Sequence, residues 1–298
     1  MTNLDIQNAY LGLDQVDRVY LGEDIVWPSG SEIDPMFWEP FTIEISNATP
    51  VPLYLVFQSG SGGTLRDIYF NKNGGPFELM LYYNQGYNQM RGQIDDSAQQ
   101  GDVYQLFSAN SAAGGYGFGT GTTDGSFHYF ASTQYLEGKV YGNIKSLLTN
   151  KDTWDALVAN KDKAGIDNIP MDDRAFMNLF RNKGFHFNDD ATYHLVLPDC
   201  NLSTNCFKGL FQGCMDMLTA PVLQASALTS GCYVNMFSGC TNLNHVTCLA
   251  DTTTSQNSFT NWLSNVAATG TFEKRPGSTW STGASGIPAG WTVQDYNS

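Results

Sequence analysis

The sequence has few charged residues, and the basic ones are the scarcer kind. Asp, Glu, Lys and Arg make up 15% of its 298 residues, and 29 acidic against 15 basic side chains give a formal net charge of −14. A protein that holds nucleic acid through its phosphates needs clustered Lys and Arg. This balance therefore argues against a nucleic-acid partner, and it favours solubility.

Long apolar runs and a secretory signal are missing as well. No stretch approaches the about eighteen apolar residues that a membrane-spanning helix requires. The first residues, MTNLDIQNAYLGLDQ, have neither the basic start nor the apolar core of a signal peptide. We therefore expect no membrane insertion, and we expect the protein to stay where it is made.

The motifs of common catalytic and metal sites are also absent. The sequence has no GxGxxG, Walker, GxSxG, HExxH or CxxC pattern. The carboxylate pairs Asp95–Asp96, Asp172–Asp173 and Asp189–Asp190 lie beside turn residues, which predicts solvated turn or helix-cap positions. We expect no enzyme, no metal and no cofactor. A carbohydrate-active enzyme, which needs two carboxylates across a cleft, is the least favoured alternative.

Aromatic residues and turn formers are plentiful. Aromatics reach 13% and there are 30 glycines, a balance typical of a mainly β protein with some helix. Short alternating runs between residues 41 and 143 predict a β-sandwich or jelly-roll-like domain. The runs are FTIEIS, LYLVFQ, DIYFN, FELMLYY, DVYQLF, SFHYFAS and KVYGNI. The NKNGGP segment predicts a hairpin turn between two of them.

No cysteine precedes Cys200, and the six cysteines lie in a stretch that repeats. CFKGLFQGCMDMLTAPVL from Cys206 aligns with CYVNMFSGCTNLNHVTCL from Cys232 at an offset of 26. AFMNLFRN begins 31 residues before Cys206 in the same frame, and SFTNWLSNV begins 26 residues after Cys232. Repeats of this length predict a solenoid, in which each unit packs on its neighbours.

Each unit is predicted to contain a short helix followed by a short strand. Apolar positions 232, 233, 236, 237 and 240 have helical spacing, Gly239 would end the helix, and Val246 and Cys248 alternate as on a strand. The alignment predicts a structural repeat core made of Phe180, Cys206, Phe211, Cys214, Cys232, Phe237, Cys240, Cys248 and Trp262.

The cysteines are predicted to be buried and reduced. On a helix, Cys232 and Cys240 would lie roughly 12 Å apart, too far for a disulfide. A bridge between stacked units would be possible but strained. Other units place Ala, Ser or Val in the cysteine positions, so small apolar side chains suffice there. Zinc is not favoured, because only His194 and His245 lie near the cysteines.

The repeat resembles the BspA type of bacterial leucine-rich repeat. CYVNMFSGCTNL followed by a strand carries the resemblance, and the segment after it is similar to a C-terminal module of Bacteroidetes proteins and their tailed phages. VYGNIKSLL, residues 140–148, is similar to the lead-in segment of that group, so the resemblance covers about residues 139 to 293. It implies a leucine-rich-repeat domain with a C-terminal cap.

The N-terminal residues contain a ten-residue segment that occurs twice in succession, first as AYLGLDQVDR and then as VYLGEDIVWP. VDRVYLGEDIVW predicts a small hairpin turning at 22–24. Two short strands are not stable alone in water, so they must cap the sandwich or dock on another chain. The segment resembles attachment segments of structural proteins in crAss-like tailed phages, which implies docking. The residues expected to dock are Tyr10, Leu11, Val19, Tyr20, Leu21, Ile25, Val26 and Trp27.

These features predict an attachment segment at 1–28, a linker at 29–40, a sandwich at 41–143, a helical lead-in and repeats at 144–257, and a degenerate last repeat with its cap at 258–298.

The resemblance implies a non-enzymatic outer fibre or decoration protein of a virion, bound to other virion proteins and assembled as a homo-oligomer such as a trimer. Trp280 and Trp291 are candidate contacts for a host-surface glycan or protein, although capping the repeats explains them better. The alternative is a bacterial cell-surface adhesin.

Overall fold

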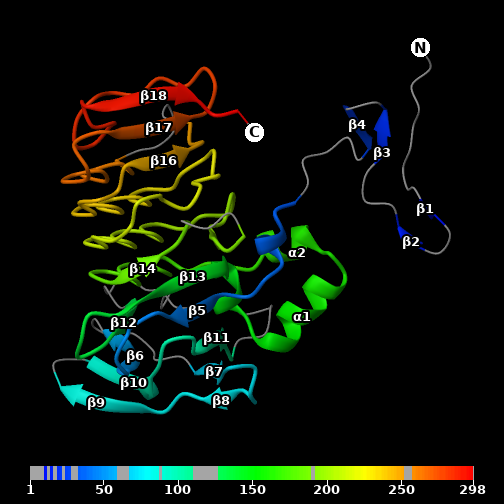
Figure 1. The fold of residues 1–298 in the computed structure, drawn as a ribbon, viewed down its shortest axis with the longest axis vertical. Coiled ribbons are helices and arrows are strands. Elements are labelled where there is room, and N and C mark those ends of the chain that lie inside the picture. The colour runs from blue at the N-terminus through cyan, green and yellow to red at the C-terminus, as the bar shows by residue number, and fades with distance from the viewer. Residues whose placement is uncertain are drawn as a thin grey trace.

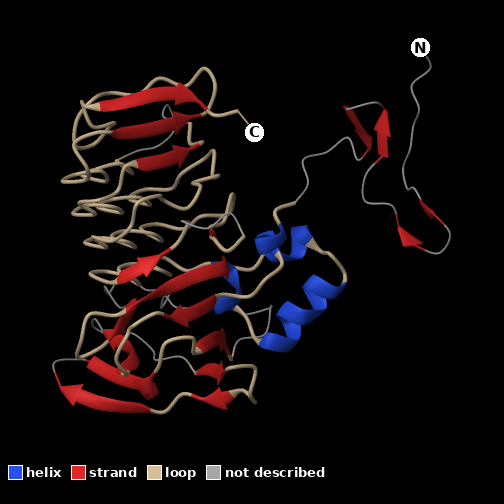
Figure 2. Ribbon diagram, in the orientation of Figure 1, coloured by secondary structure: helices blue, strands red, loops and turns tan. Residues whose placement is uncertain are grey.

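The chain is described by a computed structural model (Figure 1). It describes residues 33–58, 67–86, 89–109, 127–188, 192–251 and 257–297, and the backbone of four short strands nearer the N-terminus. Strands predominate, and the few helical segments gather at one side of the body (Figure 2). The predicted class, mainly β with some helix, is confirmed.

The strands between residues 41 and 143 belong to two sheets, one of which also contains two strands from later in the chain. One sheet has the order β12-β6-β10-β9, and the other runs β14-β13-β5-β11-β7-β8, with β15 beside β13. Their bounds are Thr42–Ile45 (β5), Val51–Gln58 (β6), Ile68–Lys72 (β7), Glu78–Leu79 (β8), Tyr82–Gly86 (β9), Gln89–Ala98 (β10), Val103–Ser108 (β11), Phe127–Ala131 (β12), Glu137–Asn143 (β13), Gly184–His186 (β14) and Leu195–Val196 (β15). Their inward side chains join one continuous apolar core.

All seven predicted runs contain a strand, with two differences. FELMLYY is divided between β8 and β9, which belong to different sheets, while the buried Met80 lies between them. Strand β10 was not predicted, because QMRGQIDDSA is too polar to show a strand pattern. It is nevertheless paired on both sides and buries Ile94 and Ala98.

The hairpin between β7 and β8 is confirmed. Tyr69 pairs with Leu79, and Asn73 and Gly74 between the strands have φ angles of 53° and 72°. Asn and Gly accept such angles at low cost, and two successive positive φ values match the twist of a hairpin.

Strand β13 joins the sheets to the rest of the chain. It pairs with β5 on one side and in parallel with β14 and β15. The helical lead-in follows it as η2 (Ile144–Leu148), α1 (Lys151–Ala159) and α2 (Lys163–Asp167). Asn150 and Asp162 accept hydrogen bonds from Thr153 and Gly165 at the starts of the two α-helices. The sheet and the core therefore continue across the predicted boundary at residue 143.

The second half of the predicted linker is packed on this body. The 3-10 helix η1, Pro35–Phe37, begins after Asp34, whose side chain accepts from the Met36 N–H. Asn143 donates from Nδ2 to the Phe37 carbonyl at 3.0 Å, and its own N–H reaches the Glu39 carbonyl. Residues 34–40 are therefore an integral part of the body.

Above the sheets the chain forms a stack of turns (Figure 1). Backbone N–H groups donate to carbonyls of the next turn along the chain, as from Phe180 to Leu210, from Phe211 to Met236 and from Phe237 to Trp262. The N–H groups between them bond three residues back within the same turn, as from Leu210 to Phe207. Each turn is thus tied to its neighbour through its backbone.

The predicted short helix is wrong in every described unit. Every fourth residue has a positive φ, which an α-helix does not allow. The positions recur at the repeat offsets: Arg174, Asn178 and Asn182, then Asn205, Gly209 and Gly213, then Gly231, Asn235 and Gly239, then Asn257, Asn261 and Asn265. The segment is a chain of tight turns, and its period of four mimics helical spacing.

The strand that was predicted after each helix-like segment is present where the pattern was clearest. β16 is His245–Cys248, and it pairs in parallel with β17, Gly270–Lys274, which pairs with β18, Trp291–Asp295. One unit earlier, Thr219 and Leu223 form isolated bridges to His245 and Cys248.

Four short strands precede the body. β1 (Tyr10–Leu11) pairs with β2 (Asp14–Gln15), and β3 (Val19–Leu21) pairs with β4 (Asp24–Trp27). Leu21 faces Asp24 across the second pair, which confirms the predicted hairpin. Neither pair joins a sheet of the body.

Candidate functional site

Aromatic rings form a column through the stack. The rings of Phe180 and Phe211 lie 5.8 Å apart and those of Phe211 and Phe237 5.4 Å apart, nearly parallel in both cases. Trp262 continues the column at 6.3 Å from Phe237. Below it, the Phe180 ring stacks on Phe130 of β12 at 5.8 Å. The column therefore ties the stacked turns to the sheets.

The cysteines of the predicted core are buried and unbridged. All six are free thiols, and Cys200 alone is half-buried. The thiols of Cys214 and Cys240 each donate to a carbonyl of the preceding turn, at 3.0 Å from the oxygens of Phe180 and Phe211. Burial raises the pKa of the Cys214 thiol to about 12, so it is a poor nucleophile.

The two tryptophans near the C-terminus lie in the cap. Trp291 is 7% exposed, its indole N–H donates to the Ala267 carbonyl, and it lines a pocket together with Trp280, so the predicted glycan contact stays a prediction. Trp280 is half-buried and stacks on Trp262 at 5.6 Å. It lines a pocket with Thr279, Ser281 and Ser285. Its role in ligand contact stays a prediction.

The predicted docking residues fall on the N-terminal strands. Tyr10 and Leu11 form β1, Val19, Tyr20 and Leu21 form β3, and Ile25, Val26 and Trp27 belong to β4. Their side chains lie outside the described residues, so the backbone alone places them. Each pair is a two-stranded sheet of its own.

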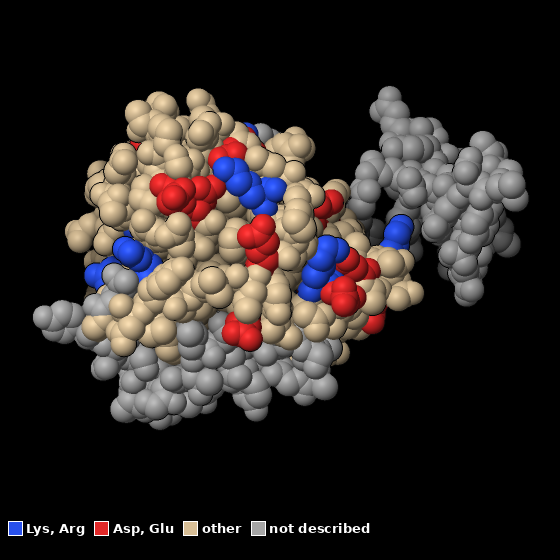
Figure 3. Space-filling view, turned by 90° about the horizontal axis from the view of Figure 1, so that it is seen from below, with Lys and Arg blue, Asp and Glu red and all other residues tan. Residues whose placement is uncertain are grey.

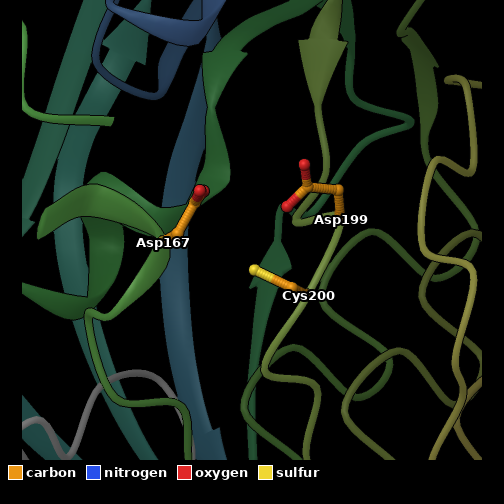
Figure 4. Close-up of side chains that lie close together, drawn as sticks. All are labelled: Asp167, Asp199 and Cys200. Atoms are coloured by element: carbon orange, nitrogen blue, oxygen red, sulfur yellow. The ribbon is translucent and has the colours of Figure 1, made fainter. Parts of the chain in front are cut away.

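A polar cluster that sequence reasoning missed joins α2 to the loop after β15. Asp167, Asp199 and Cys200 bring their donor atoms within 4.8 Å of one another (Figure 4). Lys163 reaches the carboxylates of Asp167 and Asp199 at 2.5 and 3.3 Å. The ammonium group of Lys145, which is 1% exposed, reaches the carbonyls of Ile166 and Asp167 at 3.3 and 2.5 Å.

Two lysines thus supply the positive charge of this cluster. Burial lowers the pKa of Lys145, and the Asp199 carboxylate raises the pKa of Cys200 beyond what burial alone does, to about 11. The thiol is therefore protonated at neutral pH in the metal-free protein. The ammonium group of Lys163 pairs with both carboxylates, and that of Lys145 is bonded to carbonyls beside them. The arrangement suits a structural cluster of ion pairs and hydrogen bonds, here called the polar lock, better than a metal site. The one signal in the sequence was the lysine within the apolar run NIKSLL.

The carboxylate pairs have different environments. Asp95 lies on β10, where Lys72 approaches its carboxylate at 2.8 Å and the Tyr104 hydroxyl donates to it at 2.5 Å, so the predicted solvated turn is wrong there. Asp173 accepts at 2.9 Å from the N–H of Thr204, which lies 31 residues later in the next stacked turn, so the carboxylate joins two turns of the stack. Asp189 and Asp190 lie outside the described residues.

Charge is sparse and mixed on the face seen from below. Lys and Arg lie in small groups, most of them near Asp or Glu, with uncharged surface between them (Figure 3). In the described part of the chain no helix is long and apolar enough to cross a bilayer.

No protein-family model, no curated protein and no solved structure matches the chain.

Proposed function

We propose that the protein is a non-enzymatic outer component of a tailed-phage virion, of the fibre or decoration kind. Its N-terminal strands would attach it to another virion protein, and the body would project outward. In this proposal the sheets between residues 41 and 143 form a β-sandwich, and the stacked turns form a short solenoid of the leucine-rich-repeat type with its cap.

The observation that carries the proposal is the isolation of the N-terminal strands. β1 with β2 and β3 with β4 form separate two-stranded sheets that add to no sheet of the body. Two short strands are unstable alone in water. A partner chain that covers them would supply stabilising contacts, and the separate pairing of these strands is what supports attachment.

The body supports display. The buried side chains form one continuous core from Phe37 to Trp291, and backbone hydrogen bonds tie each turn to the next, so the stack is a stiff extension of the sheets. Such a scaffold presents its side and its far end to the surroundings. A homo-oligomer, for example a trimer, suits a repeated virion component.

The test is incorporation into particles. A phage that carries the gene with residues 1–27 deleted is grown beside the wild type, and purified particles are analysed by mass spectrometry. We expect the wild-type chain in the particles and the shortened chain in the lysate only. A matched variant with Met215→Ala, at an exposed position of the stack, should incorporate normally.

Two results would overturn the proposal. Normal incorporation of the shortened chain would remove the attachment role. Recovery of the wild-type chain in bacterial envelope fractions and not in particles would favour the adhesin.

A further inference from the structure

A surface pocket lies where the four-stranded sheet meets the first stacked turn. It has a volume of about 290 Å³. The Phe130 N–H of β12 donates to the Leu179 carbonyl at 2.9 Å and holds its two walls together. The described residues that line it are Gln58, Tyr129, Asn178, Arg181, Asn182 and Lys183.

The described lining contains two cations and no carboxylate. Most described lysines of this acidic chain have a carboxylate partner, as Lys72 and Lys163 do, or donate to buried carbonyl groups, as Lys145 does. Arg181 is exposed, and no described acidic side chain pairs with it. Lys183 donates to the carbonyls of Arg181 and Asn182 at 3.2 and 3.4 Å, which leaves one of its three protons unused.

The two asparagines add further donors. A Cβ built on Gly209 would lie 2.3 Å from Oδ1 of Asn178, and one on Gly213 would lie 2.1 Å from Oδ1 of Asn182. Both amide oxygens therefore face the next turn of the stack. Because an amide is planar, its Nδ2 protons point away from that turn, and no described group accepts them.

Unused donors around a guanidinium select a ligand that carries acceptors and negative charge. The fork of an Arg side chain matches the two coplanar oxygens of a carboxylate. The amides of the lining suit hydroxyl groups, and the Tyr129 ring offers a flat surface for an apolar face. The volume is at the small end for ligand pockets, which suits one ring better than an extended chain.

We propose that this pocket binds a carboxylated sugar residue, with Arg181 on the carboxylate. The inference gives a ligand class to the displayed body and draws its biological meaning from the proposed function. Binding by the purified chain does not depend on attachment to a particle, so the two proposals can fail separately.

The test is calorimetric titration of the purified full chain with glucuronate and with N-acetylneuraminate. Glucose, which lacks the carboxylate of glucuronate, and inorganic phosphate serve as comparison ligands. We expect saturable binding of at least one carboxylated sugar and none of glucose. Arg181→Ala should weaken that binding by on the order of ten- to a hundredfold, and Arg181→Lys by less.

Two variants serve as controls. Arg275→Ala removes an exposed guanidinium in the cap and should leave the affinity unchanged. Trp280→Ala tests the cap pocket as the rival site and should also leave it unchanged. A cooperative thermal transition above the titration temperature establishes that each variant is folded.

Several outcomes would overturn the proposal: no saturable binding of either sugar, full affinity in Arg181→Ala, or loss of binding in Trp280→Ala with Arg181→Ala unaffected. Phosphate that binds as well as the sugars, and competes with them, would make the pocket a general anion site and would equally overturn the assignment.

Discussion

The Sγ atoms of Cys206 and Cys232 lie 3.1 Å apart, at the same position of two consecutive turns. Both side chains are fully buried, and burial followed by the contact with Cys232 raises the pKa of the Cys206 thiol. Cys214 and Cys240 occupy another shared position, but their thiols donate to carbonyl oxygens. The structure therefore separates one facing pair from the other thiols of the stack.

We predict that oxidation links Cys206 to Cys232 and no other pair. As purified with a reductant, the chain should label at six cysteines after denaturation. The oxidant diamide accepts two electrons and two protons from the facing thiols as their disulfide forms. Only a short movement is needed, because the normal S–S bond is about 2.05 Å. Peptide mapping under non-reducing conditions should then find this link.

Cys232→Ser serves as the matched control and should retain five reactive thiols after the same treatment. A link between Cys214 and Cys240, or no link after treatment at a temperature that loosens the stack, would contradict the prediction.

The left-handed positions of the turns give a second prediction. Gly213 and Gly239 have similar φ angles of 74° and 81°. A Cβ on Gly213 would lie 2.1 Å from Oδ1 of Asn182, whereas one on Gly239 would meet nothing closer than 3.7 Å. Asn tolerates this backbone conformation. Gly239→Asn should therefore be nearly neutral, and Gly213→Asn should lower the urea midpoint clearly.

Equal loss of stability in the two variants would mean that the backbone conformation, and not the contact with Asn182, decides. Asn182→Ala combined with Gly213→Asn should recover part of the loss, since the obstructing amide is then absent.

Sequence reasoning predicted the strands and the repeat register but not the conformation of the turns. The apolar positions 232, 233, 236, 237 and 240 fit a helix of 3.6 residues per turn and a period of four equally well. The presence of Asn or Gly at 231, 235 and 239 distinguishes the tight turns from a helix, since residues of this kind recur where φ is positive.

Other features depend on contacts between segments far apart in the chain. The pocket around Arg181 joins β12 to a turn about fifty residues later, and the lock at Lys145 joins η2 to α2 and the loop after β15. Strand β10 is polar and is held by its neighbours on both sides. Local pattern carries no information on such tertiary contacts.

The ion-pair cluster around Lys72 gives a prediction on pH. Lys72 lies 2.8 Å from Asp95 and 2.7 Å from Asp102. Burial alone would raise the pKa of each carboxyl, but hydrogen bonds from Lys72 and other donors outweigh it, so the pKa of each lies below the ordinary 3.8. Such carboxyls add stability above the ordinary pKa and lose it as the pH falls through the lowered one.

The urea midpoint of the wild type should therefore fall as the pH is lowered from about 5 to about 3, and Lys72→Met should make that fall shallower. The effect at pH 7 should stay within about 1 kcal/mol, because Lys72 is partly exposed and its charge is screened. Lys151→Met removes an exposed pair on α1 and should leave the slope as in the wild type. A slope unchanged by Lys72→Met would disprove the assignment.

The aromatic column gives the last prediction. The Phe211 ring is fully buried and lies between those of Phe180 and Phe237. Phe211→Ala removes both ring contacts and leaves a cavity that the hydrogen-bonded turns cannot close, so it should cost about 3–5 kcal/mol of unfolding free energy. Urea denaturation followed by circular dichroism measures this cost.

Met215→Ala is the matched control four residues along the same turn, and because Met215 is 48% exposed it should change the stability by less than about 0.5 kcal/mol. Phe211→Leu, which fills part of the cavity, should fall between the two. The column also predicts which part of the chain unfolds first in Phe211→Ala. Because each turn packs on its neighbours, protease cleavage of Phe211→Ala under native conditions should begin in the stacked turns, with the sheets cleaved later. Cleavage that begins in the sheets would mean that the column does not carry the stability of the stack.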